Sequence, residues 1–312
     1  MFRNIKIPAS FSLIEKGRVS LLLKEEYKNL LLAQGIDDLK TFLQKSRQTS
    51  RYFEGRTPHL SIPLENGKRM VLRQYSHGGL LQAITGNLYF FGSRSFRELA
   101  LTEEIRARKI PTIIPIGAIH HRISFPFYQA YLLSLEVPQA SDLAQYLQQI
   151  SPNPSRENLL LKRKTIRSAG FLIRQFHQAG FFHSDLQIKN ILVTRDQLLL
   201  IDFDRSYRRS ALSVRKRMKN LLRLNRSAEK WKRLGLSITR TDRWRFFLAY
   251  AGSDKEIRET MKKALRTYSL RFLLYRFGWA LGRILGSKKP RGRVKKSDTK
   301  RPLKGTLEPI NP

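Results

Sequence analysis

The hydrophobic positions in the first part of the chain form short β-type runs that alternate with helical patterns. The predicted strands are 19–23, 59–64, 68–75, 112–120 and 125–136, and the predicted helices are 25–34, 37–45 and 95–108. The pair Asn66-Gly67 lies between two strand-like runs and predicts a hairpin turn. Acidic residues open the helix at 37–45, and Pro111 ends the helix at 95–108. This part is therefore predicted to be an antiparallel sheet with helices beside it.

In the second part the pattern becomes mainly helical. A helix over 141–150 begins with Ser141 or Asp142 as its cap, and a long amphipathic helix over 157–180 ends at Gly180. Residues 210–285 are predicted to form basic helices, and residues 286–312, rich in Pro and Lys without periodicity, a disordered tail. The whole chain is thus predicted to be of the α+β class.

The net charge and the absence of cysteine limit the classes of partner and of site that are possible. The 312 residues include 60 Lys and Arg against 24 Asp and Glu, a formal net charge of +36, which attracts nucleic acid, anionic membranes or phosphorylated substrates. The chain has no cysteine, which excludes disulfides, a thiolate nucleophile and a cysteine-based zinc site. We expect neither a signal peptide nor a transmembrane span. The protein is therefore expected to be soluble or peripheral.

A few polar residues in "FFHSDLQIKNILVTRDQLLLIDFDR", residues 181–205, carry the candidate chemistry. The runs "NILV" and "LLLI" predict a hairpin that brings Asp185 and Asn190 close to Asp202. Each residue alone is an ordinary turn residue. Together their order matches phosphoryl transfer, with Asp185 as base and Asn190 and Asp202 as Mg²⁺ ligands. His183 is interpreted as a packing residue that holds this loop.

Four segments, "MVLRQYSHGGLL", "RSFRELALTEEIRARKIPTIIPIGA", "HSDLQIKNILV" and "LIDFDR", resemble the lipopolysaccharide kinases of Gram-negative bacteria, which include Kdo (3-deoxy-D-manno-octulosonic acid) and heptose kinases. The similarity covers residues from about 50 to about 250. It implies a two-lobed protein-kinase-like fold, with residues 51–135 as N-lobe and 136–285 as C-lobe, between an N-terminal extension, 1–50, and the tail.

The resemblance also implies an activity and its setting. An ATP- and Mg²⁺-dependent enzyme would phosphorylate a sugar hydroxyl, most directly of Kdo, on a lipid-linked acceptor such as Kdo-lipid A or lipopolysaccharide core. The reaction would take place on the cytoplasmic face of the bacterial inner membrane. The alternatives are a kinase for heptose, another small molecule or a protein, and a non-catalytic pseudokinase that binds membrane or RNA.

The nucleotide-binding residues of the first lobe depart from the kinase pattern. Arg73 takes the place of the lysine that holds the α/β-phosphates, and its planar fork is not equivalent to an ammonium group. Glu98 is its expected ion-pair partner, but Ser95 and Glu98 also fit a capping box, which would leave the pairing to Glu103 or Glu104.

The loop expected to cover the phosphates is also incomplete. It contains a single glycine, Gly55, where three are usual.

Two further departures concern the acceptor. Ser184 replaces the arginine that reads a phosphorylated activation loop, and Asp204 replaces the glycine of Asp-Phe-Gly, with no Ala-Pro-Glu following. Both point away from a protein substrate. Asp204 is either a further metal-side carboxylate or a partner for Arg205.

Two basic segments, 208–233 and 266–285, suggest a role for the high positive charge of the chain. Basic amphipathic helices dock on anionic membrane surfaces, although the same pattern also fits core packing. No nucleic-acid-binding module is recognisable, so no specific nucleic acid partner is expected.

Overall fold

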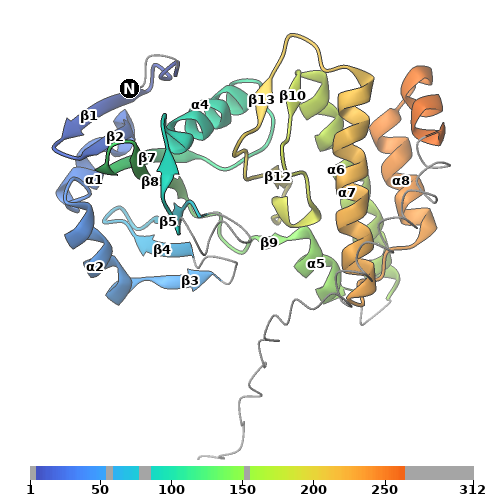
Figure 1. The fold of residues 1–312 in the computed structure, drawn as a ribbon. Helices are drawn as coiled ribbons and strands as arrows, with labels where there is room; N and C mark the ends of the chain where they lie inside the picture. Colours follow the sequence, from blue (N-terminus) through green and yellow to red (C-terminus); the bar gives the residue numbers. More distant parts are fainter. Residues whose placement is uncertain (1–4, 54–58, 77–85, 151–154, 264–312) are drawn as a thin grey trace, which may run out of the picture. The chain divides into compact units, whose positions relative to one another are not determined.

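The computed structural model describes residues 5–53, 59–76, 86–150 and 155–263 (Figure 1). In the first part of the chain the strands are β1 (Phe11–Lys16), β2 (Val19–Lys24), β3 (Arg51–Phe53), β4 (His59–Pro63), β5 (Arg69–Gln74), β6 (Tyr89–Phe90), β7 (Pro115–Ser124) and β8 (Phe127–Leu135). The helices there are α1 (Glu25–Ala33), α2 (Leu39–Thr49) and α4 (Arg94–Ala107). The predicted hairpin is confirmed, since β4 and β5 pair antiparallel across Asn66-Gly67.

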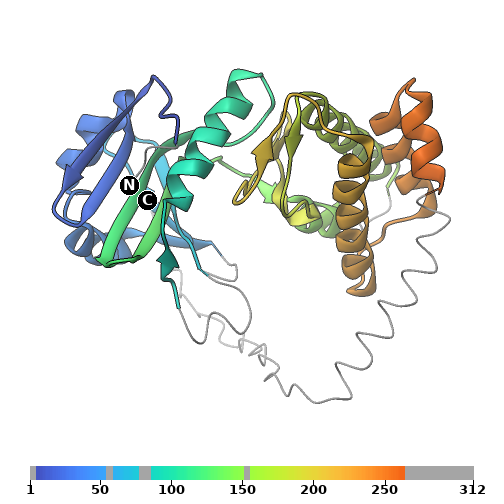
Figure 2. The ribbon, with the colours of Figure 1, turned by 45° about the horizontal axis from the view of Figure 1, so that its top comes forward.

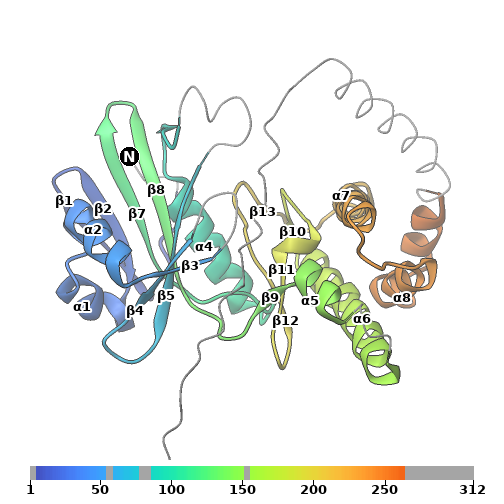
Figure 3. The same cartoon turned by 90° about the horizontal axis from the view of Figure 1, so that it is seen from below.

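These strands form one antiparallel sheet in the order β1-β2-β7-β8-β5-β4-β3, with β6 paired to β8. Alternate residues of a strand face opposite sides. In β2, Leu21 and Leu23 pack in one buried cluster with residues of α1 and α2, whereas Leu22 packs in another with Phe96 of α4. Helices therefore cover both faces of the sheet, with α1 and α2 opposite α4 (Figure 3).

The first 50 residues, which the sequence placed before the N-lobe, contribute to this sheet. Strand β2 pairs with β7 from Val19↔His121 to Leu23↔Gly117. Gly117 has no side chain to collide with β2, where a Cβ atom would lie 2.9 Å from the Leu23 side chain. The β1–β2 hairpin thus completes one end of the sheet rather than standing apart from it.

The second part of the chain is mainly helical and carries two short sheets of strands around the candidate site. Its elements are β9 (Ser141–Asp142), α5 (Leu143–Ile150), α6 (Arg156–Gln178), β10 (Phe181–Phe182), the 3₁₀ turn η1 (Ile188–Asn190), β11 (Ile191–Val193), β12 (Leu198–Leu200), β13 (Tyr207–Arg208), α7 (Val214–Arg233) and α8 (Arg240–Ala251), and residues 255–263 are also helical. The predicted hairpin of β11 and β12 and the stop at Gly180, which has φ +86°, are confirmed. The α+β class predicted from the sequence is therefore confirmed.

Close packing joins the helices of this part. A Cβ atom on Gly170 of α6 would lie 2.8 Å from the Phe246 carbonyl oxygen of α8, so the two helices approach at backbone distance (Figure 2). Between them the buried His177 ring accepts a hydrogen bond from the Tyr250 hydroxyl, 2.7 Å away. Burial lowers the pKa of His177 to about 3, so the ring is neutral. Through Asn220, the His177 ring is also linked to the loop that carries the candidate site.

Within the described ranges, no helix has the length and apolar character needed to cross a membrane. The predicted tail, 286–312, and the basic segment 266–285 lie outside the described residues.

Candidate active site

The loop that carries Asp185 runs from β10 to η1 and is held by His183. His183 is fully buried, and its Nδ1 accepts a hydrogen bond from the Asp185 backbone N–H at 3.1 Å. Its Nε2 lies 3.0 Å from the Ile201 carbonyl oxygen and donates to it. Burial lowers the pKa of His183, so the ring is the neutral Nε2–H tautomer. The packing role that the sequence indicated for His183 therefore agrees with its contacts.

Helix α7 also holds this loop, at three points spaced along one face. The Asn220 amide accepts from the His183 N–H at 3.0 Å and donates to the His183 carbonyl at 2.8 Å. Arg223 Nη1 donates to the Ser184 carbonyl, 2.5 Å away, and to Asp185 Oδ1, 2.7 Å away. One turn further, the Ser227 hydroxyl accepts from the Ile188 N–H at 3.3 Å. Three and four residues separate these side chains, which places them on one face of the helix.

Sequence reasoning missed this support because it interpreted the segment as a basic run. The available signal was the pair of uncharged polar residues Asn220 and Ser227, which interrupt the basic run at helical spacing within "NLLRLNRS". Asn220 also accepts from His177 Nε2 at 3.1 Å, which links the loop to α6.

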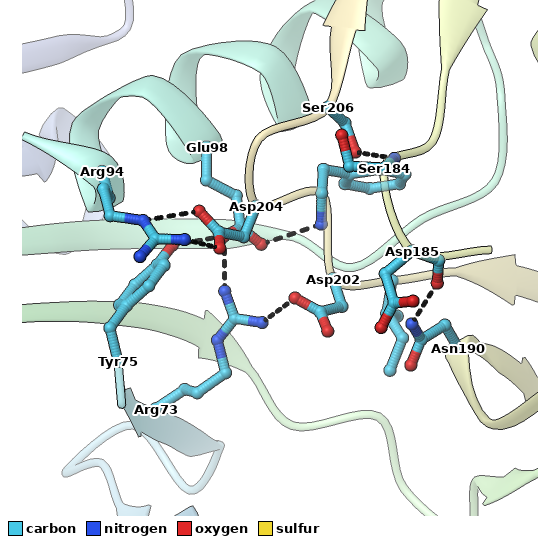
Figure 4. Close-up of polar contacts among 12 residues, drawn as sticks. Arg73, Tyr75, Arg94, Glu98, Ser184, Asp185, Asn190, Asp202, Asp204 and Ser206 are labelled. Carbon is cyan, nitrogen blue, oxygen red and sulfur yellow. Dashed lines mark hydrogen bonds and ion pairs between the residues drawn. The ribbon is translucent and has the colours of Figure 1, made fainter. Parts of the chain in front are cut away.

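Asn190 and Asp202 lie at the same end of the β11–β12 hairpin, as predicted. The Asn190 carbonyl accepts from the Ile201 N–H at 3.1 Å, one residue before Asp202. The Asn190 side-chain Nδ2 donates to the Asp185 carbonyl at 2.8 Å, which leaves Oδ1 as an acceptor (Figure 4). Asp202 has φ +67°, a left-handed conformation that turns the chain directly after β12.

The donor set of these two residues fits a magnesium ion. Among the described residues, no three His, Cys, Asp or Glu side chains are grouped to hold a metal. Magnesium is commonly held by one or two protein oxygens together with substrate phosphates, so one carboxylate and one amide oxygen suffice. Burial by itself raises the pKa of Asp202, but the Arg73 guanidinium outweighs it and holds that pKa below the usual value. Asp202 is therefore ionised, as a metal ligand must be.

Arg73, in β5, links Glu98, its predicted ion-pair partner, to Asp202, a predicted magnesium ligand. Its Nη2 lies 2.5 Å from Glu98 Oε2 and its Nη1 lies 2.7 Å from Asp202 Oδ1 (Figure 4). Glu98 is buried in α4, accepts from the Tyr75 hydroxyl, and accepts from the Phe203 N–H at 3.0 Å. Burial opposes the charge of Arg73, yet Glu98, Tyr75 and Asp202 raise the pKa of Arg73 well above its usual value. The Arg73–Glu98 pairing predicted from the sequence is present.

The alternative interpretation of Glu98 as part of a capping box is wrong. The N-cap of α4 is Ser93, whose hydroxyl accepts from the Phe96 N–H. Ser95 instead donates to the Ile119 carbonyl at 3.0 Å. Glu103 pairs with Arg106, three residues further along the same helix, and Glu104 pairs with Arg108 and Arg208. Glu98 is therefore the glutamate that pairs with Arg73.

Asp204 pairs with Arg94 at the start of α4, not with Arg205. Arg94 Nε donates to Asp204 Oδ1 at 3.0 Å, Nη2 donates to Oδ2, and the guanidinium lies 4.5 Å from the Tyr89 ring centroid. Such a two-bonded arginine–carboxylate pair has a fixed geometry. Asp204 therefore ties the segment after β12 to α4 (Figure 4).

Ser184, in place of the usual arginine, connects the loop to the same segment. Its N–H donates to the Ser206 hydroxyl at 3.0 Å, and its hydroxyl donates to the Arg205 carbonyl. The position that reads a phosphate in protein kinases here makes a direct contact with the neighbouring segment. Gly55, the remaining predicted site residue, lies outside the described residues.

Comparisons with known proteins identify the family. Residues 34–250 match the family described as "Lipopolysaccharide kinase (Kdo/WaaP) family". The "3-deoxy-D-manno-octulosonic acid kinase" of Pasteurella multocida (strain Pm70) is 34% identical over 169 residues, which cover 52% of this chain and 66% of that protein. The protein of the same name from Vibrio cholerae serotype O1 is 35% identical over 164 residues, which cover 51% of this chain and 65% of that protein.

A solved structure shares the fold. "WaaP in complex with acyl carrier protein" matches with a TM-score of 0.54 and 19% identity, over 80% of this chain and 95% of that chain. The likeness confirms the predicted fold class. The family match over residues 34–250 covers more than half of the chain, and this chain therefore belongs to the lipopolysaccharide kinase (Kdo/WaaP) family.

Proposed function

We propose that the protein transfers the γ-phosphate of ATP to a hydroxyl of a Kdo residue in the lipopolysaccharide inner core. The observation that carries this proposal is the ionic link from Glu98 through Arg73 to Asp202 in a chain of the lipopolysaccharide kinase family. It unites the phosphate-side cation with a metal-side carboxylate, next to a loop that presents a second carboxylate, Asp185. The curated relatives named as Kdo kinases support Kdo as the sugar.

Each residue would have a separate task. Asp185 would accept the proton of the attacking hydroxyl, which requires a carboxylate within hydrogen-bond reach of that group. Arg73 would hold the α/β-phosphates; its buried Nε has no hydrogen-bond partner among the described residues and so remains a donor for a phosphate oxygen. Glu98 orients Arg73, and Gly55 belongs to the loop expected over the phosphates. Asn190 and Asp202 would hold Mg²⁺, which neutralises charge on the phosphates when bound.

Incubation of the protein with Kdo-lipid A and γ-labelled ATP tests the proposal. We expect magnesium-dependent label in the lipid fraction, and none with heptose-bearing acceptors that lack an accessible Kdo hydroxyl. Label only in heptose, in another small molecule or in protein would contradict the Kdo assignment. No label in any acceptor, together with no magnesium-dependent ATP binding in a thermal-shift assay, would favour a pseudokinase.

A lipid-linked acceptor requires a protein that reaches the membrane surface, and an aromatic tip supports this. The aromatic tip consists of Phe90, Phe91, Phe125 and Phe127, at β6 and at the β7–β8 turn. Phe91 is 63% and Phe125 79% exposed, and their ring centroids lie 5.9 Å apart. Exposed clustered aromatic residues are typical of membrane-interface contacts.

The charge around the aromatic tip is complementary to an anionic bilayer. Arg97 and Arg122 are exposed near it, and Gly92 lies against the Arg97 guanidinium. The sequence has no acidic residue between Glu65 and Glu98 or between Glu104 and Glu136. We therefore propose that the aromatic tip inserts into the headgroup region of an anionic membrane, so that the protein is peripheral on the cytoplasmic face of the inner membrane.

The double variant Phe91→Ser/Phe125→Ser is expected to bind vesicles of phosphatidylglycerol and phosphatidylcholine at least about tenfold more weakly, because two apolar side chains no longer leave water. Co-sedimentation measures the binding. Leu160→Ser, at an exposed apolar position of α6, is the matched control and should bind like the parent chain. Unchanged binding of the double variant would place the membrane contact elsewhere, for example on the basic helices.

A further inference from the structure

Arg223 is in direct contact with the proposed base, and the role described for it so far is to hold the loop that carries Asp185. Its Nη1 donates to Asp185 Oδ1 at 2.7 Å and to the Ser184 carbonyl at 2.5 Å. Within the described residues, its hydrogen bonds all use Nη1. The Arg223 side chain is 37% exposed, so Nε and Nη2 remain available to a ligand.

Arg223 and Arg73, the residue proposed to hold the phosphates, contact different groups. The other carboxylate oxygen, Asp185 Oδ2, accepts from the Gln187 side chain at 2.6 Å. Arg73 contacts Glu98 and Asp202, whereas Arg223 contacts Asp185 and Ser184, so the two cations share no partner. One arginine is thus positioned for the nucleotide and the other for whatever Asp185 deprotonates.

We propose that Arg223 binds the carboxylate of the acceptor sugar, and that this contact selects a sugar acid over a neutral sugar. The proposal rests on the proposed function, because it takes the acceptor to be 3-deoxy-D-manno-octulosonic acid, which is ionised at neutral pH. The reacting hydroxyl must lie at Asp185, so the carboxylate of the same sugar lies within a few bonds of it. A guanidinium offers a planar pair of N–H groups that matches a carboxylate, and Arg223 has that pair unused.

Helix α7 gives Arg223 the rigidity that such recognition needs. The neighbouring contacts of Asn220 and Ser227 fix the helix against the loop on both sides of Arg223. The base and the carboxylate reader therefore keep a constant separation, which positions one hydroxyl of the sugar rather than another.

The experiment compares two acceptors, Kdo-lipid A and the same molecule with the Kdo carboxylate converted to a carboxamide, for the parent chain and for Arg223→Gln. We expect the parent chain to show an acceptor KM about 10- to 100-fold higher for the carboxamide, the loss typical of a hydrogen bond to a charged group. Arg223→Gln should raise the KM for the acid by a similar factor and no longer distinguish the two acceptors. The KM for ATP should not change.

Two variants control for structure. Arg215→Gln removes an exposed arginine from the same helix and should behave like the parent chain. Arg223→Lys retains the charge and should recover part of the preference for the acid, even if Arg223→Gln proves less stable in thermal melting.

The outcomes separate this inference from the proposed function. Equal KM values of the parent chain for acid and carboxamide would overturn the role of Arg223 alone. An equal fall in kcat on both acceptors in Arg223→Gln, with KM unchanged, would also overturn it and assign Arg223 to the phosphoryl group. If the parent chain phosphorylates neither acceptor, the proposed function fails, and a calorimetric titration with free Kdo then decides the inference: we expect weaker binding to Arg223→Gln, and equal binding would refute it.

Discussion

Asp185→Asn is expected to reduce phosphoryl transfer by about 10²- to 10⁴-fold, the usual contribution of a general base. Asparagine has nearly the same shape, and its Oδ1 still accepts from Arg223, but it does not take a proton at neutral pH. Because the Asp185 side chain is 46% exposed, the substitution leaves no buried group unpaired and the fold should be retained.

The measurement is the initial rate with labelled ATP and Kdo-lipid A, together with a thermal melt. Asp196→Asn, in the exposed turn of the β11–β12 hairpin, is the matched control and should keep parental activity. A rate for Asp185→Asn close to that of the parent chain would show that another group takes the proton.

Arg73→Met is expected to lower the free energy of unfolding by about 3–5 kcal/mol, because it leaves the buried carboxylate of Glu98 without its cation. The Tyr75 hydroxyl and the Phe203 N–H would still bond Glu98, but neither carries a compensating charge. Urea denaturation measures the loss. Transfer activity should also fall, because Asp202 loses the same partner.

The double variant Arg73→Met/Glu98→Met tests this reason. It removes both charges and should be more stable than Arg73→Met alone. Lys16→Met breaks an ion pair with Asp37 in which the Lys16 side chain is exposed, and should leave the stability close to that of the parent chain. If the double variant is as unstable as Arg73→Met, the unpaired carboxylate is not the cause.

Contacts between residues close in sequence were predictable from the sequence. The β11–β12 hairpin follows from two apolar runs and a polar turn, and it alone brings Asn190 and Asp202 together. The pairing of Arg73 with Glu98 followed from the kinase pattern, whereas a purely local rule, the capping box, gave a competing interpretation of Glu98. The tertiary ion pair prevailed because Ser93 already caps the helix.

Contacts between distant residues were not predictable. Nothing local distinguishes Arg94 from its many basic neighbours as the partner of Asp204, 110 positions away. Arg223 likewise appears as one charge in a basic run, and only the packing of α7 against the loop singles it out. The first 50 residues were separated from the lobe because a hairpin that joins a distant strand leaves no mark on its own periodicity.

The Arg94–Asp204 pair has a consequence for how the activity of this protein is regulated in the cell. In enzymes regulated through this segment, phosphorylation orders it and draws the helix equivalent to α4 into place. Here Asp204 and the Phe203 N–H already bind α4, and Ser184 joins the segment directly. We therefore expect every folded copy of the protein to be active without phosphorylation. The rate of acceptor phosphorylation in the cell would then depend on gene expression and on the supply of acceptor.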